Sequence, residues 1–195
     1  ATMPGLDVFF GTGVQADLKN SDVNTMYWGQ GGLGLGDRDY YTIKSDHNDK
    51  VLAAYRTYLT TLAGLIGYDE TRAKEFTDNV LAIETELAGK QMTRTEMRNI
   101  AACYNPTTVA ELVKTYPVVD LNRYFEIQKL NVDSIVVEQP AYYAAVAEAL
   151  TKQPDQVLRD YMTASYVGSA ANYLGDDFIN ANFALNQVMS GVEEQ

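Results

Sequence analysis

The spacing of apolar residues along the chain predicts mostly helices. From about Asn48 to Ile66, apolar residues recur every three or four positions, and Gly67 ends this predicted helix. Asp69 is a typical N-cap for a second helix, which ends at Gly89. Two long helices joined by a few residues are expected to form an antiparallel pair.

Shorter helices are predicted in the second half of the chain. Thr108 to Glu111 has the pattern of a capping box, in which a Thr and a Glu three positions later satisfy the first free amides of a helix. Apolar periodicity and capping residues predict further helices at 93–98, from Asp120, at 141–150 and from Pro154 to about Leu174. A last helix is predicted from about Asp176, with the apolar residues Phe178, Ile179, Phe183 and Val188.

Residues that favour β-strands gather near the start of the chain. The segments 8–10 and 23–28 are rich in aromatic and branched residues, and the polar segment 16–22 between them favours a turn. The segment 134–138 is a strand-like run that Pro140 ends, and it is a candidate to pair with this hairpin. The predicted fold is mainly α, a multi-helix domain with a small β-hairpin element near the N-terminus. Residues 1–41 would hold the hairpin and a Gly-rich loop, and residues 48–190 a helical lobe.

The amino-acid composition limits the kinds of partner that this chain can bind. With 15 Lys and Arg against 26 Asp and Glu, the 195-residue chain has a formal net charge of −11, which repels nucleic acid and anionic membrane surfaces. No run of about 18 apolar residues is present to span a bilayer. The first residues, 1–5, lack the pattern of a signal peptide. Neither end has the composition of a natural terminus, which indicates a piece of a longer polypeptide.

Few residues in this chain can support catalysis. With one histidine, His47, it cannot form the paired histidines of a zinc-protease helix. His47 lies in a polar segment and is interpreted as a solvated loop residue, and Cys103, among small apolar neighbours, as a buried hydrophobic residue. The pairs at 176–177 and 193–194 are interpreted as solvated carboxylates. A site made only of carboxylates leaves no sequence signature, so a carboxylate-only hydrolase stays an alternative.

The segment 29–36 has five glycines in eight residues and formally satisfies the G-x-G-x-x-G pattern of dinucleotide sites. A phosphate cradle also needs a helix that opens directly after the glycines. Here two acids and two bulky rings follow at 37–41. We therefore interpret the segment as a loop that uses positive φ angles and packs closely against its neighbours.

Several motifs resemble those of the neprilysin-like zinc metallopeptidases, family M13. The segment 19–24 is similar to the family's K-N-S-x-x-N, and 30–41 to its Q-x-x-L-G-L-x-x-R-D-Y-Y, which is the most specific of these motifs. Weaker similarities lie at 84–88 to I-E-x-x-[LI]-A, at 104–112 to Y-N-x-M-T-x-x-x-L, at 140–143 to P-x-[YF]-[YFL], and at 188–195 to L-x-G-x-x-x-[QE]. Together the similarities cover nearly the whole chain, and residues 1–195 are interpreted as a fragment of the N-terminal region of such a peptidase.

The resemblance implies a role in peptide hydrolysis. Members of this family are zinc endopeptidases that cut oligopeptides in a closed cavity between a catalytic lobe and a largely helical lobe, and this chain resembles the helical lobe. The family's zinc motif H-E-x-x-H, its E-x-x-x-D ligand motif and its N-A-[YF] substrate motif are absent, so no catalytic or metal residue is assigned and the chain alone is expected to be inactive. Zinc is expected only in the full-length protein. The expected partners are the C-terminal catalytic lobe of the same polypeptide and an oligopeptide substrate.

Some positions depart from the family pattern, among them Asn99, Pro106 and the segment 184–187. The single cysteine fits a bacterial member, and such proteins are commonly secreted, periplasmic or lipid-anchored, with cytoplasmic exceptions. In the Gly-rich segment we expect structural roles, with Arg38 and Asp39 tying the loop down through backbone hydrogen bonds. These structural residues are Gly31, Gly32, Gly34, Arg38, Asp39, Tyr40 and Tyr41. The alternative function is an autonomous acidic helical module that binds a peptide or protein.

Overall fold

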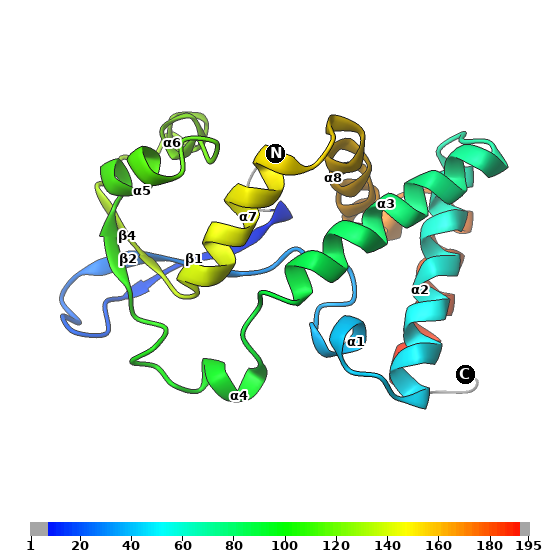
Figure 1. The fold of residues 1–195 in the computed structure, drawn as a ribbon, viewed down its shortest axis with the longest axis horizontal. Helices are drawn as coiled ribbons and strands as arrows, with labels where there is room; N and C mark the ends of the chain where they lie inside the picture. Colours follow the sequence, from blue (N-terminus) through cyan, green and yellow to red (C-terminus); the bar gives the residue numbers. More distant parts are fainter. Residues whose placement is uncertain (1–7, 192–195) are drawn as a thin grey trace. The chain divides into compact units, whose positions relative to one another are not determined.

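A computed structural model describes residues 8–191, which form mostly helices and one small sheet (Figure 1). The predicted mainly helical fold is confirmed. In chain order the elements are β1 (Phe10–Ala16), β2 (Asn24–Gln30), α1 (Asp39–Thr42), α2 (Asp46–Leu65), α3 (Glu70–Ala88), α4 (Arg94–Met97), β3 (Pro106–Thr108), α5 (Val109–Thr115), α6 (Leu121–Gln128), β4 (Ser134–Val137), α7 (Pro140–Lys152), α8 (Asp155–Ala170), the 3-10 helix η2 (Ala171–Tyr173) and α9 (Asp176–Ser190).

The chain forms two compact units, each made of two separate stretches of sequence. The first unit comprises Ala1–Gly32 and Lys90–Gln153, and the second comprises Leu33–Gly89 and Pro154–Gln195. The first therefore holds the sheet and the short helices α4 to α7, and the second holds α1, α2, α3, α8 and α9. The division into 1–41 and 48–190 that the sequence suggests stays a prediction.

The sheet of the first unit has the strand order β1-β2-β4-β3. The predicted hairpin is present, with β1 antiparallel to β2, and its turn closes where the amide of Asp17 donates to the carbonyl of Val23 at 2.8 Å. Strand β4 pairs in parallel with β2, which confirms the predicted pairing of 134–138 with the hairpin. The strand β3, antiparallel to β4, was not predicted, because it is three residues long and begins with a proline.

Aromatic rings fill the core of the first unit. Phe10 and Trp28 lie 5.2 Å apart between ring centroids on neighbouring strands. Trp28 also contacts Tyr124 of α6 edge-on at 5.2 Å, and Phe10 stacks on Tyr143 of α7 at 5.2 Å. Ring packing of this kind buries a large apolar area. It holds α6 and α7 against one face of the hairpin.

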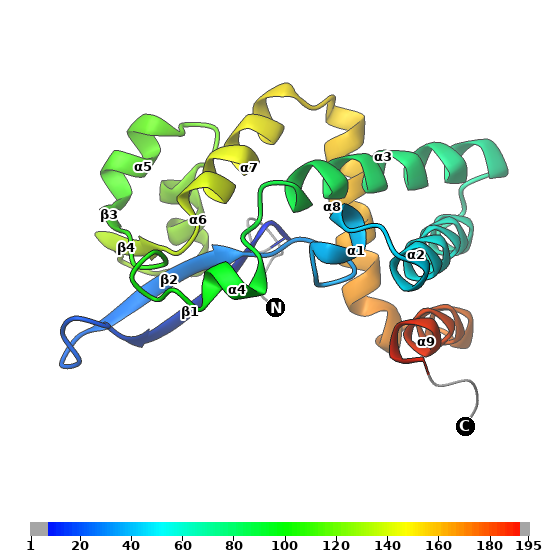
Figure 2. The same ribbon diagram turned by 60° about the horizontal axis from the view of Figure 1, so that its bottom comes forward.

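The second unit is built on the helical hairpin of α2 and α3, which follows the predicted boundaries closely (Figure 1). Both helices begin at predicted or typical N-caps, since Ser45 accepts from the amide of Asn48 and Asp69 accepts from the amide of Arg72. Helix α8 packs against α3, and α9 against α2 (Figure 2). The core between them includes Tyr55, Leu62, Phe76 and Val80.

Three local expectations are wrong. Strand β1 runs forward from Phe10 to Ala16 rather than occupying 8–10, because pairing with β2 recruits the weak strand formers that follow Phe10. His47 is exposed as expected, but it lies in the first turn of α2 and not in a loop. A short helix, α1, forms at 39–42, among the acids and rings that follow the glycines, where we predicted no helix.

The last predicted helix is present as α9, but only some of its apolar residues are buried. On α9, Leu185 is buried and Phe178 packs against the core, whereas Ile179, Phe183 and Val188 are exposed. The apolar periodicity predicted the helix correctly. Which side of α9 faces the core depends on how α9 packs against α2.

Candidate functional site

The Gly-rich segment of the first unit is held by polar side chains. The carbonyl oxygen of Gly31 accepts from the Tyr142 hydroxyl at 2.7 Å and from Gln91 Nε2 at 2.7 Å. A Cβ at Gly31 would lie 3.0 Å from the main-chain nitrogen of Gly11, so the two backbones leave little room for a side chain. Gly32 follows with φ of 77°, a conformation that favours glycine.

In the second unit the same segment meets a buried carboxylate, Glu84 of α3. Oε1 of Glu84 accepts from the Gly34 amide at 3.2 Å and from the Tyr55 hydroxyl at 3.0 Å, and Oε2 accepts from the Tyr41 hydroxyl at 2.7 Å. The Tyr41 oxygen in turn accepts from the Leu35 amide at 3.1 Å. We call Gly34, Leu35, Tyr41, Tyr55 and Glu84 the Glu84 cluster. It ties α1, α2 and α3 to the Gly-rich loop.

Burial dominates the electrostatics of the Glu84 cluster. Loss of hydration raises the pKa of Glu84 to about 7, although the hydrogen bonds from Tyr41, Tyr55 and Gly34 lower it. Burial, together with the nearby Glu84, also raises the pKa of Tyr41 and of Tyr55. The two phenols therefore remain protonated donors at neutral pH.

The backbone at Gly34 packs closely against the side chain of Tyr55. A Cβ built on Gly34 would lie 1.9 Å from the Tyr55 hydroxyl oxygen. A side chain at position 34 would therefore push that hydroxyl away from Glu84. Gly34 and Tyr41 are among the residues selected from the sequence, whereas Glu84 was noted only within the motif at 84–88. The sequence signal for its burial is an acid between Val80 and Leu87 on the apolar stripe of α3.

The remaining selected residues lie in or beside α1. Arg38 donates from Nε to the carbonyl of Ala88, the last residue of α3, at 3.0 Å, where a cation also opposes the negative end of the helix dipole. The amide of Asp39 donates to Asp37 Oδ1 at 3.0 Å, and Asp39 Oδ1 is buried with no hydrogen-bond partner within residues 8–191. Tyr40 packs against the core of the second unit.

These contacts argue against a nucleotide site. The amides of Gly34 and Leu35 already donate within the Glu84 cluster, so they do not point at an open cradle. The helix that follows has four residues, too short to supply a helix N-terminus of the kind that holds a phosphate.

Zinc does not fit the described part of the chain. Residues 8–191 contain no group of three or more His, Cys, Asp or Glu side chains that could hold a metal ion. Cys103 is buried as predicted, and burial raises the pKa of its thiol. The same range contains no helix with the length and apolar content needed to cross a bilayer.

The carboxylate-only alternative finds no support in the second unit. Among the residues of this unit up to Gly191, two acids are buried and each is separately engaged, Glu84 in its cluster and Asp160 with Arg72, Asn79 and Gln156. The pair 176–177 lies exposed in the first turn of α9, and the pair 193–194 lies outside the described residues. No pair of perturbed acids faces a common cleft among the described residues of this unit.

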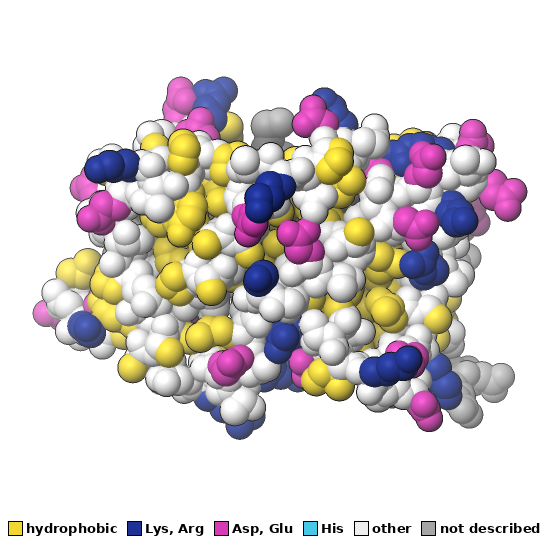
Figure 3. All heavy atoms as spheres, in the orientation of Figure 1, with side chains coloured by type: hydrophobic (Ala, Val, Ile, Leu, Met, Phe, Trp, Pro, Cys, Tyr) yellow, Lys and Arg dark blue, Asp and Glu magenta, His cyan; other side chains and the backbone are white. Residues whose placement is uncertain are grey.

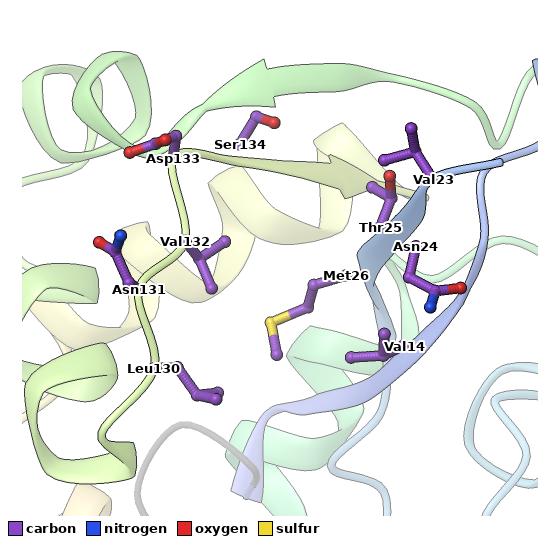
Figure 4. A pocket seen from close by; sticks show the side chains of 10 residues that line it. All are labelled: Val14, Val23, Asn24, Thr25, Met26, Leu130, Asn131, Val132, Asp133 and Ser134. Atoms are coloured by element: carbon purple, nitrogen blue, oxygen red, sulfur yellow. The ribbon is translucent and has the colours of Figure 1, made fainter. Parts of the chain in front are cut away.

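A shallow groove of about 310 Å³ opens at the end of the β1–β2 hairpin (Figure 4). Val14, Met26, Leu130 and Val132 point into it, and Asp133 lies on its rim (Figure 4). Its lining offers apolar contact, and no paired acid and base. This groove can accommodate an apolar side chain, and its residues are unsuited to acid–base catalysis.

Comparison with known proteins decides the family. The family model described as peptidase family M13 matches residues 1–195. The chain belongs to peptidase family M13. Endothelin-converting enzyme 1 of Rattus norvegicus is 32% identical over 192 residues, which is 95% of this chain and 25% of the relative. Neutral endopeptidase of Lactobacillus helveticus is 27% identical over 182 residues, 93% of this chain and 28% of the relative.

Solved structures share the fold of this M13 chain. The zinc metalloprotease Zmp1 of Mycobacterium tuberculosis, in complex with an inhibitor, gives a TM-score of 0.88 at 23% identity and covers 95% of this chain and 29% of its own. PepO from Lactobacillus rhamnosis gives 0.78 at 18% identity, covering 99% and 32%. The chain thus spans about a quarter to a third of the proteins it matches, and corresponds to their N-terminal, largely helical region.

Proposed function

We propose that this chain is the helical lobe of a zinc metalloendopeptidase that hydrolyses oligopeptides in an enclosed cavity. The observation that carries the proposal is the match of the M13 family model to all 195 residues. The catalytic zinc lobe would be a separate part of the same polypeptide, since the described residues hold no metal site. The lobe would face an oligopeptide substrate without supplying a catalytic group.

A second lobe that closes the cavity affects both the size of the substrate and the access of water. An open catalytic cleft would admit folded proteins, whereas a cavity closed by a second lobe admits short flexible peptides and excludes bulk water. The lobe therefore acts as a size filter and shapes the peptide cleft. We also propose an extracytoplasmic location for the full-length protein.

Within the lobe, we propose that Gly31, Gly32, Gly34, Arg38, Asp39, Tyr40 and Tyr41 have structural roles. The hydrogen bonds on the Gly31 carbonyl, the Gly34 amide and the Ala88 carbonyl support this. They fix the path of the Gly-rich segment in each unit, so that the helices around it keep a constant position within their unit.

The test compares this chain with the full-length protein. A quenched fluorescent decapeptide and a stable folded protein are offered to each, with and without a chelator, and bound zinc is measured by mass spectrometry. We expect the full-length protein to bind zinc and cleave only the peptide, with activity lost on chelation. The chain alone should retain no zinc after gel filtration and cleave neither substrate.

Zinc-dependent peptide cleavage by the purified chain alone would refute the proposal. Cleavage of the folded protein at the same rate as the peptide would refute the size filter while leaving the family unchanged. The alternative, an autonomous interaction module, is not favoured by the family match. It would require the chain to bind a peptide or protein tightly without any catalytic partner.

A further inference from the structure

An apolar stripe lies exposed along α8 and into η2 in the second unit. Met162 and Tyr166 are one turn apart on the same side of α8, and Tyr173 follows at the end of η2. The side chains are accessible, with 58% of Tyr166 and 89% of Tyr173 exposed. The opposite side of α8 is buried through Tyr161 and Ala164.

Helix α9 carries a second apolar group, and η2, at the end of the stripe, packs against α9. Ile179 and Phe183 are one helical turn apart, and 44% of Phe183 is exposed. Asn182 Nδ2 donates to Asn172 Oδ1 at 2.8 Å, which holds η2 against the flank of α9 next to Phe183. Leu174, also exposed, joins the two elements. We call Met162, Tyr166, Tyr173, Leu174, Ile179 and Phe183 the α8–α9 face.

The sequence around the α8–α9 face is depleted of charge. From Tyr161 to Ser190 there is no Lys or Arg, and the only acids are Asp176 and Asp177. A chain with 21% charged residues would place about six in such a stretch. By contrast, α2 and α3 carry mixed charges on their outer sides, and Figure 3 shows acidic and basic side chains interspersed where these helices lie.

Exposed aromatic residues with few charges are typical of a protein–protein contact and not of a solvated surface. Two occupants fit this chemistry: another part of the same polypeptide, or a second copy of this chain. The matched proteins carry this region in one chain of which it is 25% to 32%, so most of each such polypeptide lies outside the present residues. A large intramolecular partner is therefore available to cover the face.

We propose that the α8–α9 face is the surface on which the catalytic part of the same polypeptide docks. The inference rests on the proposed function, because it takes its occupant from the two-lobed peptidase. The contact would be mainly apolar, with Tyr166, Tyr173 and Phe183 as its anchors. Tyrosine and phenylalanine are well suited to this, since they bury a large area for few rotatable bonds.

Thiol labelling tests the face directly. In a Cys103→Ala background, Tyr173→Cys and Phe183→Cys are each introduced into this chain and into the full-length protein. Lys74→Cys, on the exposed side of α3, is the matched control. Reaction with a maleimide is followed by mass spectrometry at low micromolar protein, after circular dichroism has shown that each variant is folded.

We expect the three thiols to react at similar rates in the chain alone, and those at 173 and 183 to slow at least about tenfold in the full-length protein while the control is unchanged. Equal rates at 173 and 183 in both proteins would overturn the proposal. Protection that already appears in the chain alone and grows with its concentration would overturn it in favour of a second copy.

Peptide cleavage, measured on the same full-length preparations, separates the two proposals. Protection at 173 and 183 without any zinc-dependent cleavage would show that another part of the polypeptide covers the face, but it would refute the proposed function and, with it, a catalytic occupant. Cleavage without protection would uphold the function and refute the docking surface.

Discussion

Glu84 is a buried acid that three donors surround, and its protonation affects folding. Burial raises its pKa from 4.5 to about 7 in the folded protein. The folded state therefore keeps the proton over a pH range in which the unfolded chain has lost it. Stability from this group is present below pH 4.5 and is lost as the pH rises to about 7.

Glu84→Gln removes this titration while keeping the size of the side chain. As the pH rises from 4.5 to 7, the wild type should lose on the order of 3 kcal/mol of unfolding free energy from this group, and the variant should not. The stability difference should thus shift in favour of the variant over that range. Urea denaturation at a series of pH values measures it.

The control for this variant is Glu86→Gln, which removes the same charge from an exposed position of the same helix. It should leave the pH dependence of the wild type in place. The interpretation of Glu84 fails if Glu84→Gln and the wild type show parallel stability curves between pH 4.5 and 7.5.

Gly34 is required because the Tyr55 hydroxyl occupies the space where a Cβ would lie. Gly34→Ala should lower the free energy of unfolding by about 1–3 kcal/mol, since Tyr55 must leave Glu84 or the loop must shift. Gly64→Ala is the matched control: nothing lies within 4 Å of its built Cβ in α2, and it should raise stability by up to about 1 kcal/mol. Thermal unfolding of both variants measures these changes. A Gly34→Ala variant as stable as the wild type would contradict the requirement for glycine at this position.

At the scale of elements, two ion pairs distinguish a buried contact from an exposed one. Asp160 of α8 is buried and accepts from Arg72 Nη2 and from Asn79 Nδ2, so it joins α8 to α3. Asp78 of α3 pairs with Arg56 of α2, and both side chains are about half exposed. Replacing the aspartate by asparagine should therefore lower the free energy of unfolding by different amounts at the two sites.

Asp160→Asn should lower the free energy of unfolding by about 2–3 kcal/mol, because it leaves the Arg72 charge with only the exposed carboxylate of Glu75 at 4.0 Å and turns an amide donor toward other donors. Asp78→Asn should stay within about 0.5 kcal/mol of the wild type, because water screens that pair. Urea denaturation at pH 7 compares them. Equal losses from the two substitutions would mean that Asp160 does not hold α8 in place.

At the scale of the whole molecule, charge governs which partners can approach. A net charge of −11 should prevent binding to polyanions at physiological salt. We expect no shift of duplex DNA in a gel at micromolar protein and 150 mM salt, and retention on an anion-exchange resin at pH 7. Salt-sensitive DNA binding under these conditions would show that a local basic surface outweighs the net charge.

The helices, their caps and the early hairpin could be predicted from the sequence alone. The capping box at Thr108, the N-cap at Asp69 and the apolar periodicity of α2 and α3 are local signals, so each could be read within a few residues. The family could also be inferred, because motifs such as that at 30–41 are short and contiguous. These features depend on residues that are close together in the sequence, so they can be recognised without the tertiary structure.

The burial of individual side chains and the grouping of helices into units depend on packing between segments that are distant in sequence. Glu84 is buried because Gly34, Tyr41 and Tyr55 come to it from outside α3, and no local pattern records those partners. Each unit combines two separate stretches of chain, so its members could not be grouped by sequence order. Periodicity placed Ile179 and Phe183 on an apolar stripe, but whether a stripe is buried depends on which other surface reaches it, and this is a property of the folded chain.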